Sequence, residues 1–148
     1  MRILLAIDGS EYSKTAIENV AKRAFQANAE VRVISVYTIA SRLIQVDPGG
    51  VLREYYAEMD KSALESAKNI TEEAAKTLQK ENPKLLVSTI QIGGSAKRMI
   101  LEEAESFGAD LIILGAHGYG RVEGFLIGSV SQSVMLHAKC SVEVVRKP

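Results

Sequence analysis

The sequence has little of what marks several large classes of protein. Its 148 residues include one cysteine, three prolines and no tryptophan, and 18 lysine and arginine residues balance 18 aspartate and glutamate residues. Cys140 alone cannot form an internal disulfide, which fits a reducing compartment and predicts a cytoplasmic protein. A net charge of zero argues against a nucleic-acid-binding surface, since such surfaces carry an excess of lysine and arginine.

Long hydrophobic runs are also absent. The longest, such as residues 3–7, have only a few residues, whereas a membrane-spanning helix needs about 20. The run at 3–7 is also too short for a signal peptide, so neither a signal nor a membrane segment is expected. With 47% hydrophobic residues the chain can close one core, and residues 1–148 are predicted to form a single domain.

Five short hydrophobic runs are typical of β-strands. The runs at 3–7 and 111–114 are apolar at consecutive positions, as in central parallel strands covered on both faces. The other three lie at residues 31–36, 85–90 and 142–145. Each run is followed or preceded by a segment with helical spacing, so the predicted order is β-α-β-α-β-α-β-α-β.

Four helices are predicted between these strands. The first follows Asp8-Gly9-Ser10, the second ends near Pro83, the third runs from a possible Ser95 cap to Gly108, and the fourth opens at Gly128-Ser129. The apolar stripes that define them contain Ala16, Val20 and Ala24; Ala63, Ala67, Ile70, Ala74 and Leu78; Ala96, Ile100 and Ala104; and Val130 and Val134.

Such alternation predicts the α/β fold class, a five-stranded parallel sheet with helices on both faces and right-handed crossovers. Residues 41–60, which include Asp47-Pro48-Gly49-Gly50, form the one long irregular stretch. A lid, a partner surface and a mobile insertion are all open interpretations of a loop of that length.

Two segments are expected at the ligand site of such a sheet. Ligands bind beyond the carboxyl ends of the strands, where the strand order reverses, and Asp8-Gly9-Ser10 and Gly115-Ala116-His117-Gly118 follow the first and fourth strands. Gly115 and Gly118 lack a Cβ where the backbone must turn and approach a ligand closely. Asp8 can accept hydrogen bonds from ribose hydroxyls or hold a cation through water, and it can also form an Asx turn.

Gly128-Ser129 completes the pattern, nine residues after Gly118. The start of a helix offers free backbone N–H groups and the positive end of the helix dipole, and Ser129 adds a hydroxyl. A polyphosphate fits this arrangement without a dedicated lysine. The alternative is a glycine-rich turn that only joins a strand to a helix.

These segments together resemble the universal stress protein family, in its ATP-binding branch. The likeness covers nearly the whole chain and is carried by residues 7–13, 92–96 and 109–118, and by the spacing Gly115-x2-Gly118-x9-Gly128-Ser129. It implies a Rossmann-like sheet of order 3-2-1-4-5, of the adenine nucleotide alpha hydrolase-like kind. It also implies a homodimer that acts in stress survival through nucleotide-dependent interactions, and the last strand, an edge strand, is expected to form the dimer contact.

The resemblance also implies a set of residues that bind ATP, with or without Mg²⁺. Gly115, Gly118, Gly128 and Ser129 would hold the phosphates and ribose, and Val130 would help with the phosphates. Ala6, Ile7 and Asp8 would line the nucleoside site, and the backbone of Val36 would contact the adenine edge. His117 belongs to the same loop. ADP, AMP and cyclic nucleotides remain open as ligands.

The sequence departs from the family pattern in two places. Tyr119 follows the second glycine where many relatives have a basic residue, and Arg121 is a possible substitute; a proline often found before the third helix is also absent.

No catalytic constellation is evident around His117, His137 or Cys140, so fast chemistry is not expected, although slow Mg²⁺-dependent ATP hydrolysis stays open. The chain lacks the acidic residues that a receiver domain needs and a tryptophan to cover the flavin ring of a flavodoxin. It also lacks the P-loop lysine of a Walker-type ATPase. A family member that no longer binds ATP and acts only as a scaffold is a further alternative, against which the intact glycine spacing counts.

Overall fold

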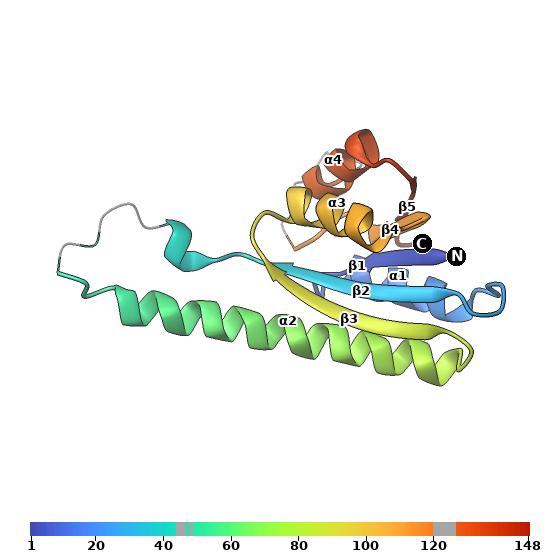
Figure 1. Ribbon diagram of the computed structural model, residues 1–148, viewed down its shortest axis with the longest axis horizontal. Helices are drawn as coiled ribbons and strands as arrows, with labels where there is room; N and C mark the ends of the chain where they lie inside the picture. Colours follow the sequence, from blue (N-terminus) through green and yellow to red (C-terminus); the bar gives the residue numbers. More distant parts are fainter. Residues whose placement is uncertain (44–46, 48, 120–126) are drawn as a thin grey trace.

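The structure is a computed structural model that describes residues 1–43, 47, 49–119 and 127–148. Its centre is a five-stranded parallel sheet of order β3-β2-β1-β4-β5 (Figure 1). The strands are β1 (Arg2–Ala6), β2 (Glu30–Tyr37), β3 (Leu86–Gly93), β4 (Leu111–Gly115) and β5 (Ser141–Val145). The predicted fold class and strand order are both confirmed, and β3 continues three residues beyond the predicted end at Ile90.

Helices cover both faces of the sheet, as predicted. They are α1 (Glu11–Lys22), α2 (Arg53–Glu81), α3 (Ala96–Phe107) and α4 (Ser129–His137), with a short 3-10 helix, η1 (Ala40–Leu43), after β2. In Figure 1, α3 and α4 lie on one side of the sheet and α1 and α2 on the other. Each face therefore has its own layer of helices.

The two layers enclose two cores that share the central strand. Ile3 and Leu5 of β1 pack toward α1 and α2, whereas Leu4 and Ala6 pack toward α3 and α4. Both cores are dry, since Ile3, Leu4 and Leu5 have no exposed surface. Successive side chains of a strand point to opposite faces, so a strand buried on both sides is apolar at every position.

The predicted helix ends agree in part with the structure. The Ser10 hydroxyl accepts a hydrogen bond from the Ser13 backbone N–H at 3.3 Å and caps α1. Gly108 ends α3 in the left-handed conformation (φ 68°), which glycine adopts at little cost. Ser95 occupies the N-cap position of α3, but its side chain makes no capping hydrogen bond. Helix α2 ends at Glu81, shortly before Pro83.

The irregular stretch predicted at 41–60 is shorter in the structure. Helix α2 begins at Arg53, and η1 covers Ala40–Leu43. The N-terminal part of α2 extends past the end of the sheet (Figure 1), so it buries no apolar stripe there. Hydrophobic periodicity does not reveal this part of α2, because it reports only the part of a helix that packs on a core. Residues 44–46 and 48, including Pro48, lie outside the described residues.

The Asp60 carboxylate joins η1 to this projecting part of α2. It accepts hydrogen bonds from the Ala40 backbone N–H and the Ser41 hydroxyl, both at 2.6 Å. The hydrogen bond from Ser41 is the main reason that the pKa of Asp60 lies below its ordinary value. The chain that leaves β2 is therefore held against α2.

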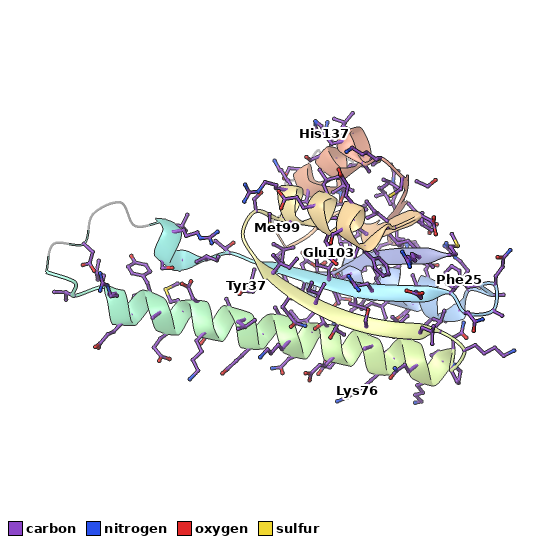
Figure 2. The ribbon with its side chains drawn as sticks, in the orientation of Figure 1. Phe25, Tyr37, Lys76, Met99, Glu103 and His137 are labelled. Atoms are coloured by element: carbon purple, nitrogen blue, oxygen red, sulfur yellow. The ribbon has the colours of Figure 1, made fainter. Side chains whose placement is uncertain are left out.

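A partly buried ion pair fixes α3 on the sheet. Glu103 of α3 lies 2.6 Å from the guanidinium of Arg32 on β2, and its side chain is only 9% exposed. The same guanidinium lies 4.1 Å from the ring centroid of Phe107, a cation–π contact. In Figure 2 Glu103 lies between α3 and the sheet, whereas Lys76 points outward from α2. No helix of the described residues has the length and apolarity that crossing a membrane requires.

Candidate functional site

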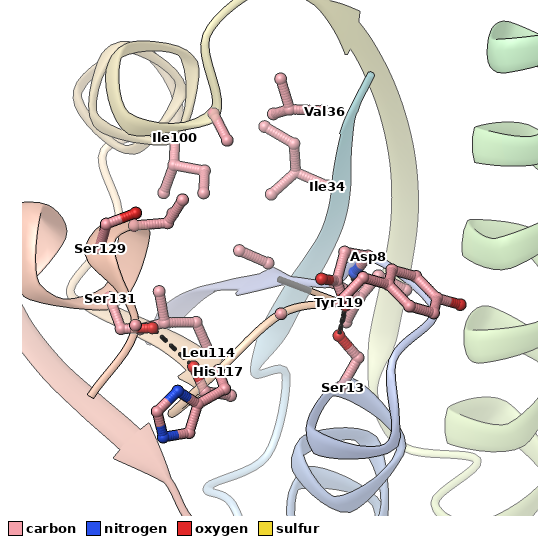
Figure 3. A pocket seen from close by; sticks show the side chains of 17 residues that line it. Asp8, Ser13, Ile34, Val36, Ile100, Leu114, His117, Tyr119, Ser129 and Ser131 are labelled. Carbon is pink, nitrogen blue, oxygen red and sulfur yellow. Dashed lines mark hydrogen bonds between the residues drawn. The ribbon is translucent and has the colours of Figure 1, made fainter. Parts of the chain in front are cut away.

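A cavity opens at the carboxyl ends of β1, β2 and β4, on the side of the sheet covered by α3 and α4. Its volume is about 270 Å³, near the lower end of the range for small-molecule sites. The structure brings every residue of the predicted site to this one cavity (Figure 3): Ala6, Ile7, Asp8, Val36, Gly115, His117, Gly118, Gly128, Ser129 and Val130.

One wall of the cavity is apolar. The strand register aligns Ile34, Ala6 and Leu114 in one row across β2, β1 and β4, and all three side chains are buried. Val36 continues the wall along β2, and Ile100 closes it from α3. In Figure 3 Ile34, Val36 and Ile100 face the same space. This wall suits a flat, apolar group such as an aromatic ring.

Asp8 ends β1 and forms part of a serine-rich hydrogen-bond network. Its Oδ1 accepts hydrogen bonds from the Ser10 backbone N–H at 2.9 Å and from the Ser13 hydroxyl at 2.7 Å. The Asp8 backbone N–H in turn donates to the Ser13 hydroxyl oxygen at 2.9 Å. The contact with Ser10 is the expected Asx turn, so Asp8 has a structural role in addition to any contact with a ligand.

Gly118 lies against the second carboxylate oxygen of Asp8. A Cβ built on Gly118 would stand 2.5 Å from Asp8 Oδ2, a distance that no real Cβ tolerates. Its backbone does not adopt a positive φ, so the need for glycine comes from space and not from a left-handed turn. The missing side chain at Gly118 leaves room for the carboxylate itself.

The packing of α1 on β4 requires a glycine at position 115. It is the last residue of β4, and a Cβ there would lie 2.6 Å from Tyr12 Cβ and 2.9 Å from the Tyr12 carbonyl carbon. The first turn of α1 thus packs directly on the β4 backbone. Helix packing therefore requires glycine at position 115 whether or not a ligand approaches it, and the close approach of a ligand to Gly115 stays a prediction.

The start of α4 forms the polar wall opposite Asp8. The N-cap residue is Gly128, which has no side-chain oxygen to cap the first turn, and its own N–H donates to the Ala116 carbonyl at 2.7 Å. Ser129, Val130 and Ser131 follow and all line the cavity. The first N–H groups of a helix have no acceptor within the helix, so this end of α4 offers donors and a partial positive charge to the cavity.

The described residues include no catalytic constellation at the cavity. His117 is half-buried, and its ring lies edge-on to Tyr12 with centroids 5.1 Å apart. His137 is exposed at the outer end of α4 (Figure 2), and its Nδ1 lies 2.8 Å from the Ser133 carbonyl. Burial raises the pKa of the Cys140 thiol, which keeps it protonated and poorly nucleophilic at neutral pH.

Several lining residues were absent from the predicted site. Ile34 precedes Val36 by two positions on β2 and so shares its face, a signal that strand periodicity could have supplied. Tyr119, treated only as a departure from the family pattern, is 75% exposed, and its hydroxyl flanks Gly9. The full set of additional residues is Ser13, Ile34, Ala96, Ile100, Leu114, Tyr119 and Ser131. Arg121, the possible replacement for the basic residue that many relatives have after the second glycine, lies outside the described residues.

The sheet order defines a doubly wound α/β protein, and the cavity lies at the reversal point where sheets of this class bind small molecules. The model of the universal stress protein family matches residues 1–146, and the chain belongs to that family. Universal stress protein YxiE of Bacillus subtilis is 31% identical over 152 residues, which cover 98% of each chain.

Solved structures share the fold over the whole chain. Hypothetical protein MJ0577 superimposes with a TM-score of 0.85 at 28% identity, covering 99% of this chain and 96% of that one. A universal stress protein in complex with cAMP superimposes with a TM-score of 0.66 at 23% identity, covering 99% of this chain and 96% of the other. An Arabidopsis thaliana family member with AMP bound superimposes with a TM-score of 0.71 at 16% identity, covering 100% and 92%. The last two likenesses establish the fold alone.

Proposed function

We propose that this protein binds ATP and acts as a nucleotide-dependent regulatory module in the stress response, as a single domain over residues 1–148. The observation that carries the proposal is that one cavity combines an apolar wall, a carboxylate and the start of a helix. An adenine base, a ribose and a phosphate chain need these three environments in this order. The cAMP and AMP complexes of proteins with the same fold support an adenine nucleotide as the ligand class.

In this proposal the base packs against the wall formed by Ile34, Ile100 and Leu114, with the backbone of Val36 at its polar edge. The phosphates lie at Gly128, Ser129 and Val130, because backbone donors and the helix dipole stabilise negative charge there. Ala6, Ile7 and Asp8 face the nucleoside. Gly115, His117 and Gly118 form the loop between these two ends of the ligand.

Mg²⁺ fits the site only as a companion of the phosphates. Within the described residues, no three histidine, cysteine, aspartate or glutamate side chains come together to hold a metal ion. The Ser129 hydroxyl can contact a water of the hydrated ion, as suits a cation that keeps much of its water. The chain itself would then contribute orientation of the phosphates and no metal cage.

ATP is proposed as a ligand and not as a rapidly consumed substrate. Asp8 is an oriented carboxylate at the cavity, but it lies across the cavity from the start of α4, where the phosphates are proposed to bind, so it is not placed to activate water for attack on them. Slow hydrolysis through Mg²⁺ and an ordered water is the alternative. We also propose a homodimer formed through β5, and a cytoplasmic location. The position of β5 at an edge of the sheet supports the dimer.

Calorimetric titration of the purified protein with ATP, ADP, AMP and cAMP tests the proposal. A ligand that binds only the native state stabilises it by about 2.7 kcal/mol at a hundredfold excess over Kd, so ATP should raise the melting temperature clearly. Mass spectrometry of small molecules released on denaturation would identify a ligand that copurifies. Failure of all four nucleotides to bind at millimolar concentration would contradict the proposal, and phosphate release at about 1 per second or faster would favour an enzyme.

A further inference from the structure

We infer that Ser13 is a positioning residue for ligand recognition: it fixes Asp8 so that a single carboxylate oxygen, Oδ2, accepts a hydrogen bond from a ribose hydroxyl. The inference rests on the proposed nucleotide site and goes beyond it. It assigns a role to a residue of α1 outside the predicted site, and it predicts which part of the nucleotide the pocket can distinguish.

The hydrogen bonds between Ser13 and Asp8 run in both directions. The Ser13 hydroxyl donates to Asp8 Oδ1 at 2.7 Å and accepts from the Asp8 backbone N–H at 2.9 Å. Ser13 is only 3% exposed, so water cannot readily replace either contact. With the Ser10 N–H also donating to Oδ1, this oxygen is fully used and the rotamer of Asp8 is set.

The second oxygen of the same carboxylate, Asp8 Oδ2, faces Gly118 at the cavity. No side chain or backbone group of the described residues donates a hydrogen bond to it, and it faces the bare α-carbon of Gly118 at the cavity. Figure 3 shows Ser13 below Asp8, with the dashed hydrogen bond on the side away from the cavity centre. One oxygen of the carboxylate therefore holds the loop, and the other is left for a ligand.

A hydroxyl donor suits Oδ2 better than a phosphate does. A carboxylate repels phosphate oxygens, and the donor groups at the start of α4 lie across the cavity from Asp8, as the positions of Ser129 and Asp8 in Figure 3 show. A ribose lies between a base and its phosphates and carries neutral hydroxyl donors at O2′ and O3′. Asp8 is then expected to distinguish ribose from its deoxy forms.

The experiment compares binding of ATP, 2′-deoxy-ATP and 3′-deoxy-ATP to five proteins by calorimetry: the unaltered chain, Ser13→Ala, Ser10→Ala, Asp8→Ala and the double variant with Asp8→Ala and Ser13→Ala. Ser10→Ala is the control: it removes a buried hydroxyl that caps α1 and lies 3.4 Å from the Ser13 hydroxyl, but it keeps both hydrogen bonds between Ser13 and Asp8. The preference for ATP over each analogue is a ratio of affinities, so a partly unfolded variant does not distort it.

The unaltered chain should prefer ATP over at least one deoxy analogue by roughly tenfold, the usual effect of losing a hydrogen bond to a charged group. Ser13→Ala should bring this preference close to one, as Asp8→Ala does, and Ser10→Ala should retain it. In the Asp8→Ala background, Ser13→Ala should change the ratio no further.

Three outcomes would overturn the inference while leaving ATP binding intact. In the first, the unaltered chain shows no ribose preference. In the second, Ser13→Ala keeps the full preference. In the third, Ser13→Ala changes only the dependence of affinity on Mg²⁺, which would assign Asp8 to a cation. Absence of any nucleotide binding by the unaltered chain would instead contradict the proposed function.

Discussion

Gly118 lies so close to Asp8 that any side chain at position 118 would meet the Asp8 carboxylate. A Cβ on Gly118 would lie 2.5 Å from Asp8 Oδ2, although the backbone of Gly118 is one that any residue adopts. The glycine pattern of the family is thus explained at this position by the carboxylate that ends β1. The proposed ligand site therefore depends on the absence of a side chain at position 118.

Gly118→Ala should therefore lower ATP affinity by roughly tenfold or more and leave the fold largely intact, because the new methyl group displaces the carboxylate. Gly118→Val should abolish binding. Calorimetry on Gly118→Ala, Asp8→Ala and the double variant tests the cause. If the defect acts through Asp8, the double variant should bind no worse than Asp8→Ala alone. Additive losses would contradict this explanation.

Gly115→Ala should instead destabilise the fold. The added methyl group meets the backbone of Tyr12 on α1, which cannot rotate away as a side chain can. Overpacking of this kind costs about 1–3 kcal/mol, measurable by urea unfolding without any nucleotide. A normally stable Gly115→Ala protein that fails to bind ATP would show that the glycine serves the ligand after all.

Two serines near the start of α4 should respond differently to alanine. The Ser131 hydroxyl is buried and donates to the Gly115 carbonyl at 2.7 Å, so Ser131→Ala should cost about 1–3 kcal/mol of stability. Ser129 is exposed at the cavity, so Ser129→Ala should leave stability almost unchanged and reduce the rise in melting temperature that ATP produces. Thermal melts of both variants with and without ATP separate the two effects.

The ion pair between Arg23 and Glu143 makes stability depend on pH. Arg23 follows α1 and donates two hydrogen bonds to the Glu143 carboxylate on β5, and this contact holds the pKa of Glu143 below its ordinary value. A carboxyl group with a lowered pKa in the folded state stabilises the fold above its unfolded pKa. That contribution is lost as the pH falls from the ordinary carboxyl range through the lowered value.

Glu143→Gln should accordingly reduce stability at neutral pH by about 0.5–1 kcal/mol, a small effect because both side chains are about a third exposed, at 35% and 36%. The difference from the unaltered chain should vanish in acid and shrink in high salt. Urea unfolding at pH 7 and pH 3, at two salt concentrations, measures it. A difference that persists in acid would assign the effect to packing.

The proposed dimer predicts that the two edges of the sheet are not equivalent. A lysine in an edge strand opposes pairing with another strand, so Ser141→Lys, at an exposed position of β5, should give a monomer. Leu86→Lys is the matched control, because Leu86 lies on the other edge strand, β3, and is 56% exposed. Light scattering at micromolar concentration should find Leu86→Lys still dimeric. A monomeric unaltered chain would contradict the dimer.

Local sequence determined most of the architecture. The fully apolar runs of β1 and β4 indicate central strands, and the stripes of the four helices indicate a layer on each face, because burial on both sides leaves no position for a polar residue. The glycine spacing and the loop after β1 also indicated the cavity residues Asp8, Gly115, Gly118, Gly128 and Ser129, since the carboxyl ends of parallel strands meet at one edge. Ala6, Ile7, Val36 and Val130 were expected only from the resemblance to the family.

Only the tertiary structure decided what these residues do to one another. Gly115 and Gly118 look alike in sequence, yet one makes room for Tyr12 and the other for Asp8, and these neighbours come from other parts of the chain. Ser13 lies in the segment 7–13 that carries the family resemblance, but the sequence did not show that its hydroxyl contacts Asp8. The projecting start of α2 was also invisible, since it packs on no core. Sequence patterns report burial, whereas the close approach of Gly115 to Tyr12 and of Gly118 to Asp8 arises only when the elements assemble.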